Sequence, residues 1–84
     1  MTQPYTGAVQ LKTRTALVLF IKGGSAPVAL YTDNPQKDYE EIQKLVKTGS
    51  TTCFEKSDLQ GPVKRITIAA NQISAVALQE EQYA

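Results

Sequence analysis

The residue types that most often carry out chemistry are scarce in this sequence. It contains no histidine and one cysteine, Cys53. Without histidine there is no Ser-His or Cys-His nucleophile pair, no imidazole ligand for a metal and no ready general base near neutral pH. A structural zinc site is built mainly from several cysteine or histidine ligands, which this chain lacks. We therefore expect a protein that is not an enzyme and holds no metal or cofactor.

Two short segments could still form sites, and each has a simpler structural explanation. Cys53 would need a nearby cation to become a reactive thiol, but Glu55 lies between it and Lys56, the only cation close in sequence. We expect Cys53 to be packed, because free cysteine behaves as a small hydrophobic residue. Gly23-Gly24-Ser25 could bind an anion through backbone N–H groups. A phosphate loop leads into a helix, however, whereas Pro27 and a strand-like segment follow here, so we expect a hairpin turn.

Four acidic residues, Asp33, Asp38, Glu40 and Glu41, lie close enough together to suggest a site for a divalent cation. Calcium-binding loops place their oxygen ligands at alternate positions around a glycine, and no such pattern is present. We expect these carboxylates to complement the dipole at the beginning of a helix instead.

A basic cluster is formed by Lys12, Arg14 and Lys22, which share one face of a predicted strand with Phe20. Basic groups beside an aromatic residue on a sheet are typical of proteins that bind single-stranded nucleic acid. Such surfaces usually carry two or three aromatic residues, and the net charge of this chain is only +1. We therefore favour a solvated face and keep nucleic-acid binding as the alternative.

The length of 84 residues and the hydrophobic fraction of 42% fit a single domain, residues 1–84, with a thin core. We expect order from about residue 7 to 79, between polar tails. The longest apolar run, 16–21, is far shorter than the ~20 residues of a membrane helix, and the first residues do not resemble a signal peptide. With its lone cysteine, the chain is expected to be cytoplasmic and to make no membrane contact.

Hydrophobic periodicity predicts an α+β fold in the order β-β-α-β-β(-β), with a single helix packed on a mainly antiparallel sheet. Asn34 is a suitable N-cap, Pro35 suits the first helical turn, and Gly49 is expected to end the helix. Segments of alternating or β-rich composition predict the strands, at residues 7–22 with a bend or break at 13–15, and at 28–31, 51–55, 63–69 and 73–78.

Several short motifs between residues 39 and 78 carry a resemblance to a known family: Tyr39, Ile42, Leu45 and Gly49, the run Thr52-Cys53-Phe54-Glu55-Lys56, and Ile73-Ser74-Ala75-Val76. In these residues the chain resembles a family of small uncharacterised ββαββ proteins from cyanobacteria and plastids. The resemblance implies a hairpin before the helix, a closing strand, and a cytoplasmic or stromal setting. It implies no activity and no catalytic residue.

The segment Ala16–Ile21 is apolar on both faces of the predicted strand. One helix can cover only one of these faces, so the other needs a different cover. We therefore predict a non-catalytic protein-interaction or assembly module that pairs with a second copy, as a homodimer, or with another protein. The expected interface consists of Val18 and Phe20, with Lys12 and Arg14 at its rim.

Overall fold

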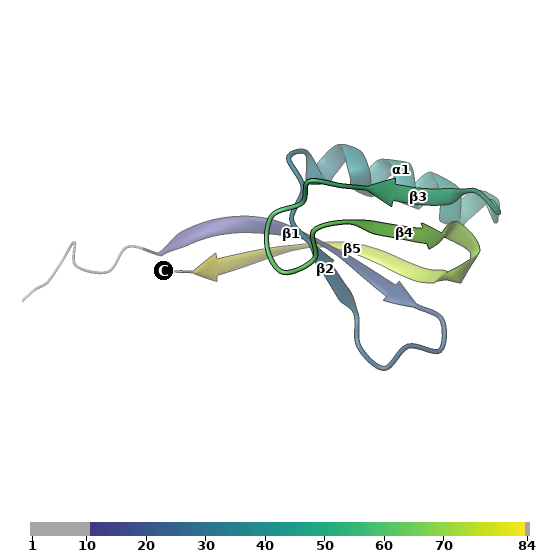
Figure 1. The fold of residues 1–84 in the computed structure, drawn as a ribbon, viewed down its shortest axis with the longest axis horizontal. Coiled ribbons are helices and arrows are strands. Elements are labelled where there is room, and N and C mark those ends of the chain that lie inside the picture. The colour runs from purple at the N-terminus through teal and green to yellow at the C-terminus, as the bar shows by residue number, and fades with distance from the viewer. Residues whose placement is uncertain (1–10, 84) are drawn as a thin grey trace, which may run out of the picture.

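Two antiparallel sheets and one helix make up the computed structural model, which describes residues 11–83 (Figure 1). A three-stranded sheet has the order β2-β1-β5, and a two-stranded sheet pairs β3 with β4. This arrangement confirms the predicted fold class and the predicted order of elements. The elements are β1 (Lys12–Ile21), β2 (Val28–Leu30), α1 (Pro35–Thr48), β3 (Cys53–Lys56), β4 (Ile66–Ala69), the 3-10 turn η1 (Ala70–Gln72) and β5 (Ile73–Tyr83).

Both ends of α1 form as the sequence predicts. The Asn34 side chain accepts a hydrogen bond from the Lys37 N–H at 3.1 Å, and Pro35 occupies the first turn, where its missing N–H costs no helical hydrogen bond. Gly49 ends the helix in the left-handed conformation, with φ of 65°. No helix in residues 11–83 is both long and apolar enough to span a bilayer.

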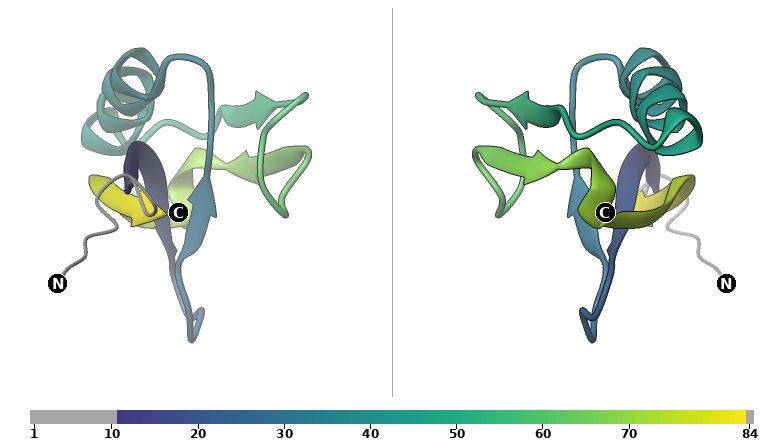
Figure 2. Two further views of the ribbon diagram at one scale, coloured as in Figure 1. Left: turned by 90° about the vertical axis from the view of Figure 1, so that its left-hand side faces the viewer. Right: turned by 90° about the vertical axis from the view of Figure 1, so that its right-hand side faces the viewer.

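The core lies between the three-stranded sheet and a layer formed by α1 and the β3–β4 hairpin (Figure 2). Leu17 and Leu19 point from β1 into this layer, where they meet Ile42 of α1 and Phe54 of β3. All four side chains are buried. The alternation along β1 thus supplies one face of the core, and α1 covers it, as expected.

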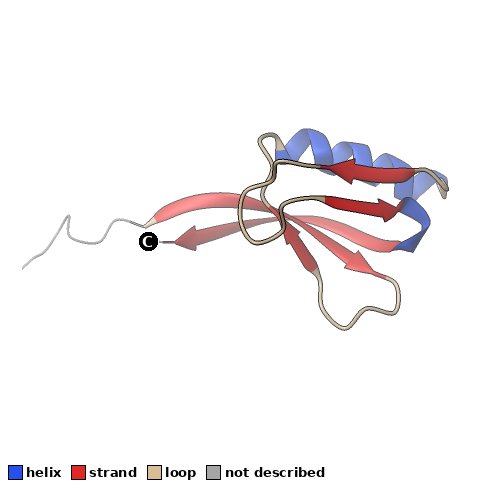
Figure 3. Cartoon of the chain, viewed as in Figure 1, coloured by secondary structure: helices blue, strands red, loops and turns tan. Residues whose placement is uncertain are grey.

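The strand boundaries correct the sequence prediction at three places. β4 begins at Ile66, so the predicted strand residues 63–65 lie outside it. β1 runs through residues 13–15 without a break, and the irregularity lies instead at a bulge between Phe20 and Ile21. β5 continues to Tyr83 through the segment expected to be a polar tail from Gln79 onward (Figure 3). Within the described residues β1 begins at Lys12, and the predicted strand residues 7–10 lie outside the described range, so the prediction for them is untested.

Candidate functional site

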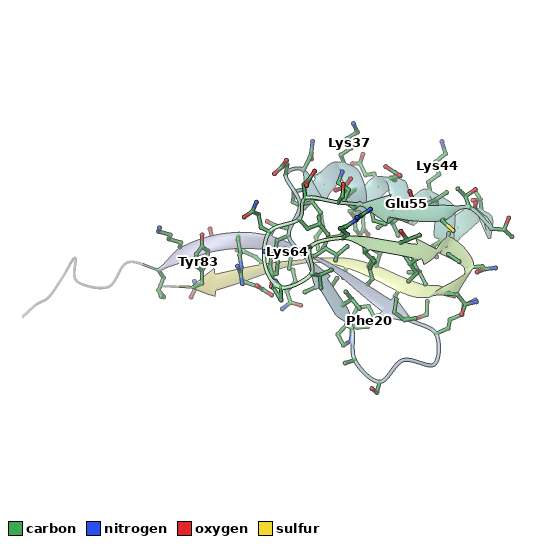
Figure 4. All side chains as sticks on the ribbon, viewed as in Figure 1. Phe20, Lys37, Lys44, Glu55, Lys64 and Tyr83 are labelled. Atoms are coloured by element: carbon green, nitrogen blue, oxygen red, sulfur yellow. The ribbon has the colours of Figure 1, made fainter. Side chains whose placement is uncertain are left out.

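The four residues of the predicted interface share the face of the three-stranded sheet that points away from α1, which we call the outer face. Figure 4 labels Phe20 and Tyr83, which lie toward opposite ends of this face. Directly paired residues of neighbouring strands point to the same side of a sheet, so the register defines this face. Its members are Lys12, Arg14, Ala16, Val18 and Phe20 of β1, Ala75, Ala77, Gln79, Glu81 and Tyr83 of β5, and Ala29 and Tyr31.

Val18 and Phe20 differ in how much surface they offer. Val18 is paired with Ala29 on one side and Ala77 on the other, and it is only 5% exposed. Phe20, paired with Ala75, is 40% exposed. Val18 is therefore covered by its neighbours and offers little surface to a partner. Phe20 provides most of the exposed apolar surface at this end of the outer face.

Phe20 lies beside the bulge, where β5 has one residue more than β1. Phe20 pairs with Ala75 and Ile21 with Ile73, so Ser74 has no direct partner. The Ser74 hydroxyl donates to the Phe20 carbonyl oxygen at 3.0 Å. This bond holds the backbone of the bulge and lets Ile21 remain on the core side while Phe20 stays on the outer face.

At the other end of the outer face, Arg14 lies between two tyrosine rings. Its guanidinium carbon Cζ is 4.0 Å from the centre of the Tyr31 ring and 4.9 Å from that of Tyr83. Its Nε donates to the Glu81 carboxylate at 3.2 Å, and the Tyr31 hydroxyl donates to the same carboxylate oxygen at 2.9 Å. We call Arg14, Tyr31, Glu81 and Tyr83 the arginine–tyrosine cluster.

The cluster changes the acidity of Tyr31. The hydrogen bond that Tyr31 donates to Glu81 raises the pKa of the Tyr31 hydroxyl above its ordinary value of 10.0, and burial raises it further. The positive charge of Arg14 acts in the opposite direction and does not cancel the rise. Tyr31 is therefore a neutral hydrogen-bond donor at neutral pH.

The loop that contains Gln60 and Gly61 packs against Tyr31. The Gln60 N–H donates a hydrogen bond to the Tyr31 backbone carbonyl at 3.0 Å. Gly61 lies so close to the Tyr31 ring that a Cβ at this position would be 2.6 Å from the ring atom Cδ2. Gly61 has φ of +80°, a conformation that side-chain-bearing residues seldom adopt. An open groove of about 450 Å³ lies beside this ring, and it is lined by Arg14, Thr15, Tyr31, Thr32, Pro35, Gln60, Gly61 and Tyr83.

Sequence patterns did not predict that Tyr31, Glu81 and Tyr83 belong to this surface. Gln79, Glu81 and Tyr83 do alternate with Glu80 and Gln82, but both sets are polar, so hydrophobic periodicity gives no sign of a strand. Recognising the cluster requires the pairing of β1 with β5, which are far apart in sequence.

The other candidate residues lie elsewhere. Cys53 is exposed, which corrects the expectation that it is packed. Its neighbour Phe54 takes the inward position of β3, so alternation along the strand directs Cys53 outward. Asp38 is buried at the beginning of α1 and accepts a bond from Lys56 Nζ at 3.2 Å. In the part of the chain that is described, no three metal-ligating side chains converge.

A second groove, of about 520 Å³, contains lysine, arginine and carboxylate side chains. It lies where β3 and β4 meet the preceding turn, and its lining includes Asp33, Lys56, Asp58 and Arg65. Lys56 is already bonded to the buried Asp38. The absence of enzymatic activity stays a prediction.

Comparison with protein families, with curated proteins and with solved structures finds no match. The resemblance of residues 39–78 to the cyanobacterial and plastid proteins therefore stays a prediction as well.

Proposed function

We propose that this chain is a non-catalytic interaction and assembly module that associates with itself, with the outer face as its contact surface. The observation that carries the proposal is the 40% exposure of Phe20 on a sheet face over which no helix or strand of residues 11–83 packs (Figure 2). An exposed aromatic ring surrounded by small apolar residues is suited to act as the anchor of a contact, because it can fill a pocket of a partner.

The neighbours of Phe20 suit close contact with a flat partner. Ala29, Ala75 and Ala77 surround β1 on this face, and their small side chains allow another surface to approach the sheet closely. Lys12 and Arg14 lie at the polar end, where an interface usually has its hydrated rim. A second copy of this chain offers a flat apolar surface with a charged rim of the same kind. The alternative within this proposal is that a different protein binds the same face. A reducing cytoplasm is the setting we propose, since Cys53 is exposed and unpaired.

Sedimentation velocity over a range of concentrations tests this proposal. We expect the wild-type chain to associate and Phe20→Glu to weaken that association, because the variant places a carboxylate in the apolar contact. Thr67→Lys adds a charge at an exposed strand position of the other sheet, opposite Glu55, and is the control that should associate like the wild type. The proposal would be contradicted if the wild-type chain stays monomeric at all concentrations and if a pull-down recovers no protein whose binding Phe20→Glu abolishes.

Binding of single-stranded nucleic acid is a second candidate, favoured by one specific observation. Tyr31 and Tyr83 join Phe20 on the outer face, which gives three aromatic residues beside Lys12 and Arg14. From Lys12 to Phe20 the face extends about 27 Å at the usual rise of ~3.4 Å per strand residue, which is enough for several nucleotides.

Fluorescence anisotropy with single-stranded RNA and DNA at two salt concentrations tests this candidate. Binding should weaken as salt is added, and Tyr83→Ala should reduce it by removing a stacking surface. Absence of binding at low salt would exclude the candidate and leave the protein-contact proposal untouched.

A further inference from the structure

The two edges of the three-stranded sheet are protected to different degrees. The edge strand β2 has three residues and follows Pro27, and just beyond it Tyr31 forms a bridge with Gln60 of the neighbouring loop. Short edge strands, prolines and covering loops prevent a sheet edge from pairing with other chains. The edge at β2 is therefore closed.

The opposite edge, β5, lacks these protections. β5 is 11 residues long and contains no proline, glycine or lysine. Its bulge, at Ser74, lies at the very beginning and leaves 75–83 regular. Among residues 11–83, only β1 pairs with it, and Figure 2 shows β5 on the side of the sheet away from β2. A row of backbone N–H and C=O groups is thus left for an added strand.

We infer that this edge is a second contact surface, whose occupant is β5 of another copy of this chain, paired antiparallel about a two-fold axis. The inference rests on the proposed self-association and names one way in which it occurs. Two-fold symmetric contacts are the commonest in homo-oligomers, and antiparallel pairing of β5 with its own copy is one such contact.

Full overlap of the two strands places the middle residue, Leu78, on the axis. Glu80 then lies opposite Val76 of the partner subunit, and Glu81 lies opposite Ala75 of the partner subunit. No carboxylate faces another in this register, whereas a pairing shifted toward the acidic end would bring the glutamates together, which is unfavourable. The charges of β5 therefore disfavour registers shifted toward Glu80 and Glu81, and full overlap of the strands selects the pairing about Leu78.

This pairing joins two sheets into one of six strands. Both helices lie on one side and both outer faces on the other, because the axis is perpendicular to the sheet. Complete pairing of β5 would contribute about ten main-chain hydrogen bonds, which is the number found across a typical protein interface. Together with the outer face, each copy would have two independent self-complementary contacts, as an assembly module requires.

Site-specific disulfide formation tests the pairing. In a background that carries Cys53→Ser, which removes the exposed native thiol, and Phe20→Glu, which removes the outer-face contact, Ala77→Cys and Gln79→Cys each introduce one cysteine. The inferred register places residue 77 of one copy opposite residue 79 of the other, within reach of a disulfide. A mixture of the two variants under oxidised glutathione should form the covalent heterodimer several-fold more than either variant forms its homodimer. Ser57→Cys, in an exposed loop, is the control and should not cross-link.

The outcomes separate this inference from the proposed function. If sedimentation shows only monomers and no cysteine pair cross-links, both fail. If the chain associates and Phe20→Glu abolishes the association, while residues 77 and 79 do not cross-link, the edge pairing is wrong and the contact at the outer face stands. Cross-linking of Ser57→Cys at the same rate would show random collision and would also overturn the edge pairing.

Discussion

The hydroxyl of Tyr31 gives the sharpest test of the arginine–tyrosine cluster. Tyr31→Phe keeps the ring against Arg14 and removes only the hydrogen bond to Glu81, whose length is 2.9 Å. A hydrogen bond to a charged group contributes about 1.5–3 kcal/mol. Because the Glu81 side chain is 25% exposed and keeps its bond to Arg14, we expect a loss of about 1 kcal/mol in the free energy of unfolding.

The pH dependence of this loss follows from the direction of the pKa shift. Folding raises the pKa of Tyr31 above 10.0, so the folded state keeps this proton when the unfolded state has begun to lose it. The contribution is fully present below pH 10.0 and is lost as pH rises through the higher pKa of the folded state. The stability difference between wild type and Tyr31→Phe should therefore be constant near neutral pH and shrink in alkaline solution.

Urea unfolding followed by circular dichroism measures both effects, and the ultraviolet absorbance of tyrosinate measures the titration itself. Tyr39→Phe is a matched control, because the Tyr39 hydroxyl contacts Gln43 on the helix and no carboxylate. Glu81→Gln should lower the pKa of Tyr31 by weakening its acceptor. The reasoning would be refuted by a Tyr31→Phe protein as stable as the wild type, or by a stability difference that grows above pH 10.

Three further substitutions test the supports of the fold. Gly61→Ala should destabilise the chain by about 2–4 kcal/mol, because its Cβ would clash with the Tyr31 ring at a positive φ; thermal unfolding at the wild-type temperature would contradict this. Lys56→Met leaves the Asp38 carboxylate buried without a cation, and we expect a loss of about 2–3 kcal/mol in urea unfolding that Asp38→Asn in the same chain largely restores. Asn34→Ala removes the N-cap bond and should cost about 1 kcal/mol, whereas Asn34→Asp should preserve helix content and stability; equal stability of the two variants would speak against the cap.

The elements that the sequence predicts well are those whose determinants are close together in the chain. The signals for α1 all lie between Asn34 and Gly49, and each end forms as expected. The alternation along β1 likewise places Arg14 and Phe20 on one face, whatever strands pair with it. Local sequence patterns thus predicted the helix, and they also predicted which residues of β1 lie on the outer face.

The features that the sequence did not predict depend on partners far away in the chain. The last part of β5 is polar on both faces, and it is a strand because it pairs with β1, for example Glu81 with Arg14. Burial of Val18 and exposure of Cys53 also depend on which strands flank them. Periodicity identifies the side of a strand on which a residue lies, but only the packing of the other elements decides how much of that residue is covered.

The position of Glu81 favours a protein contact over nucleic acid at the outer face. Its carboxylate already pairs with the Arg14 side chain, so a phosphate would have to compete for that charge. With one or two phosphates neutralised, the affinity for a single strand would change only about tenfold per tenfold change in salt, which marks weak electrostatic binding. Contact through Phe20 needs no such charge and is nearly independent of salt. Glu81→Gln separates the two, because it would strengthen nucleic-acid binding and steepen its salt dependence while leaving association through Phe20 unchanged.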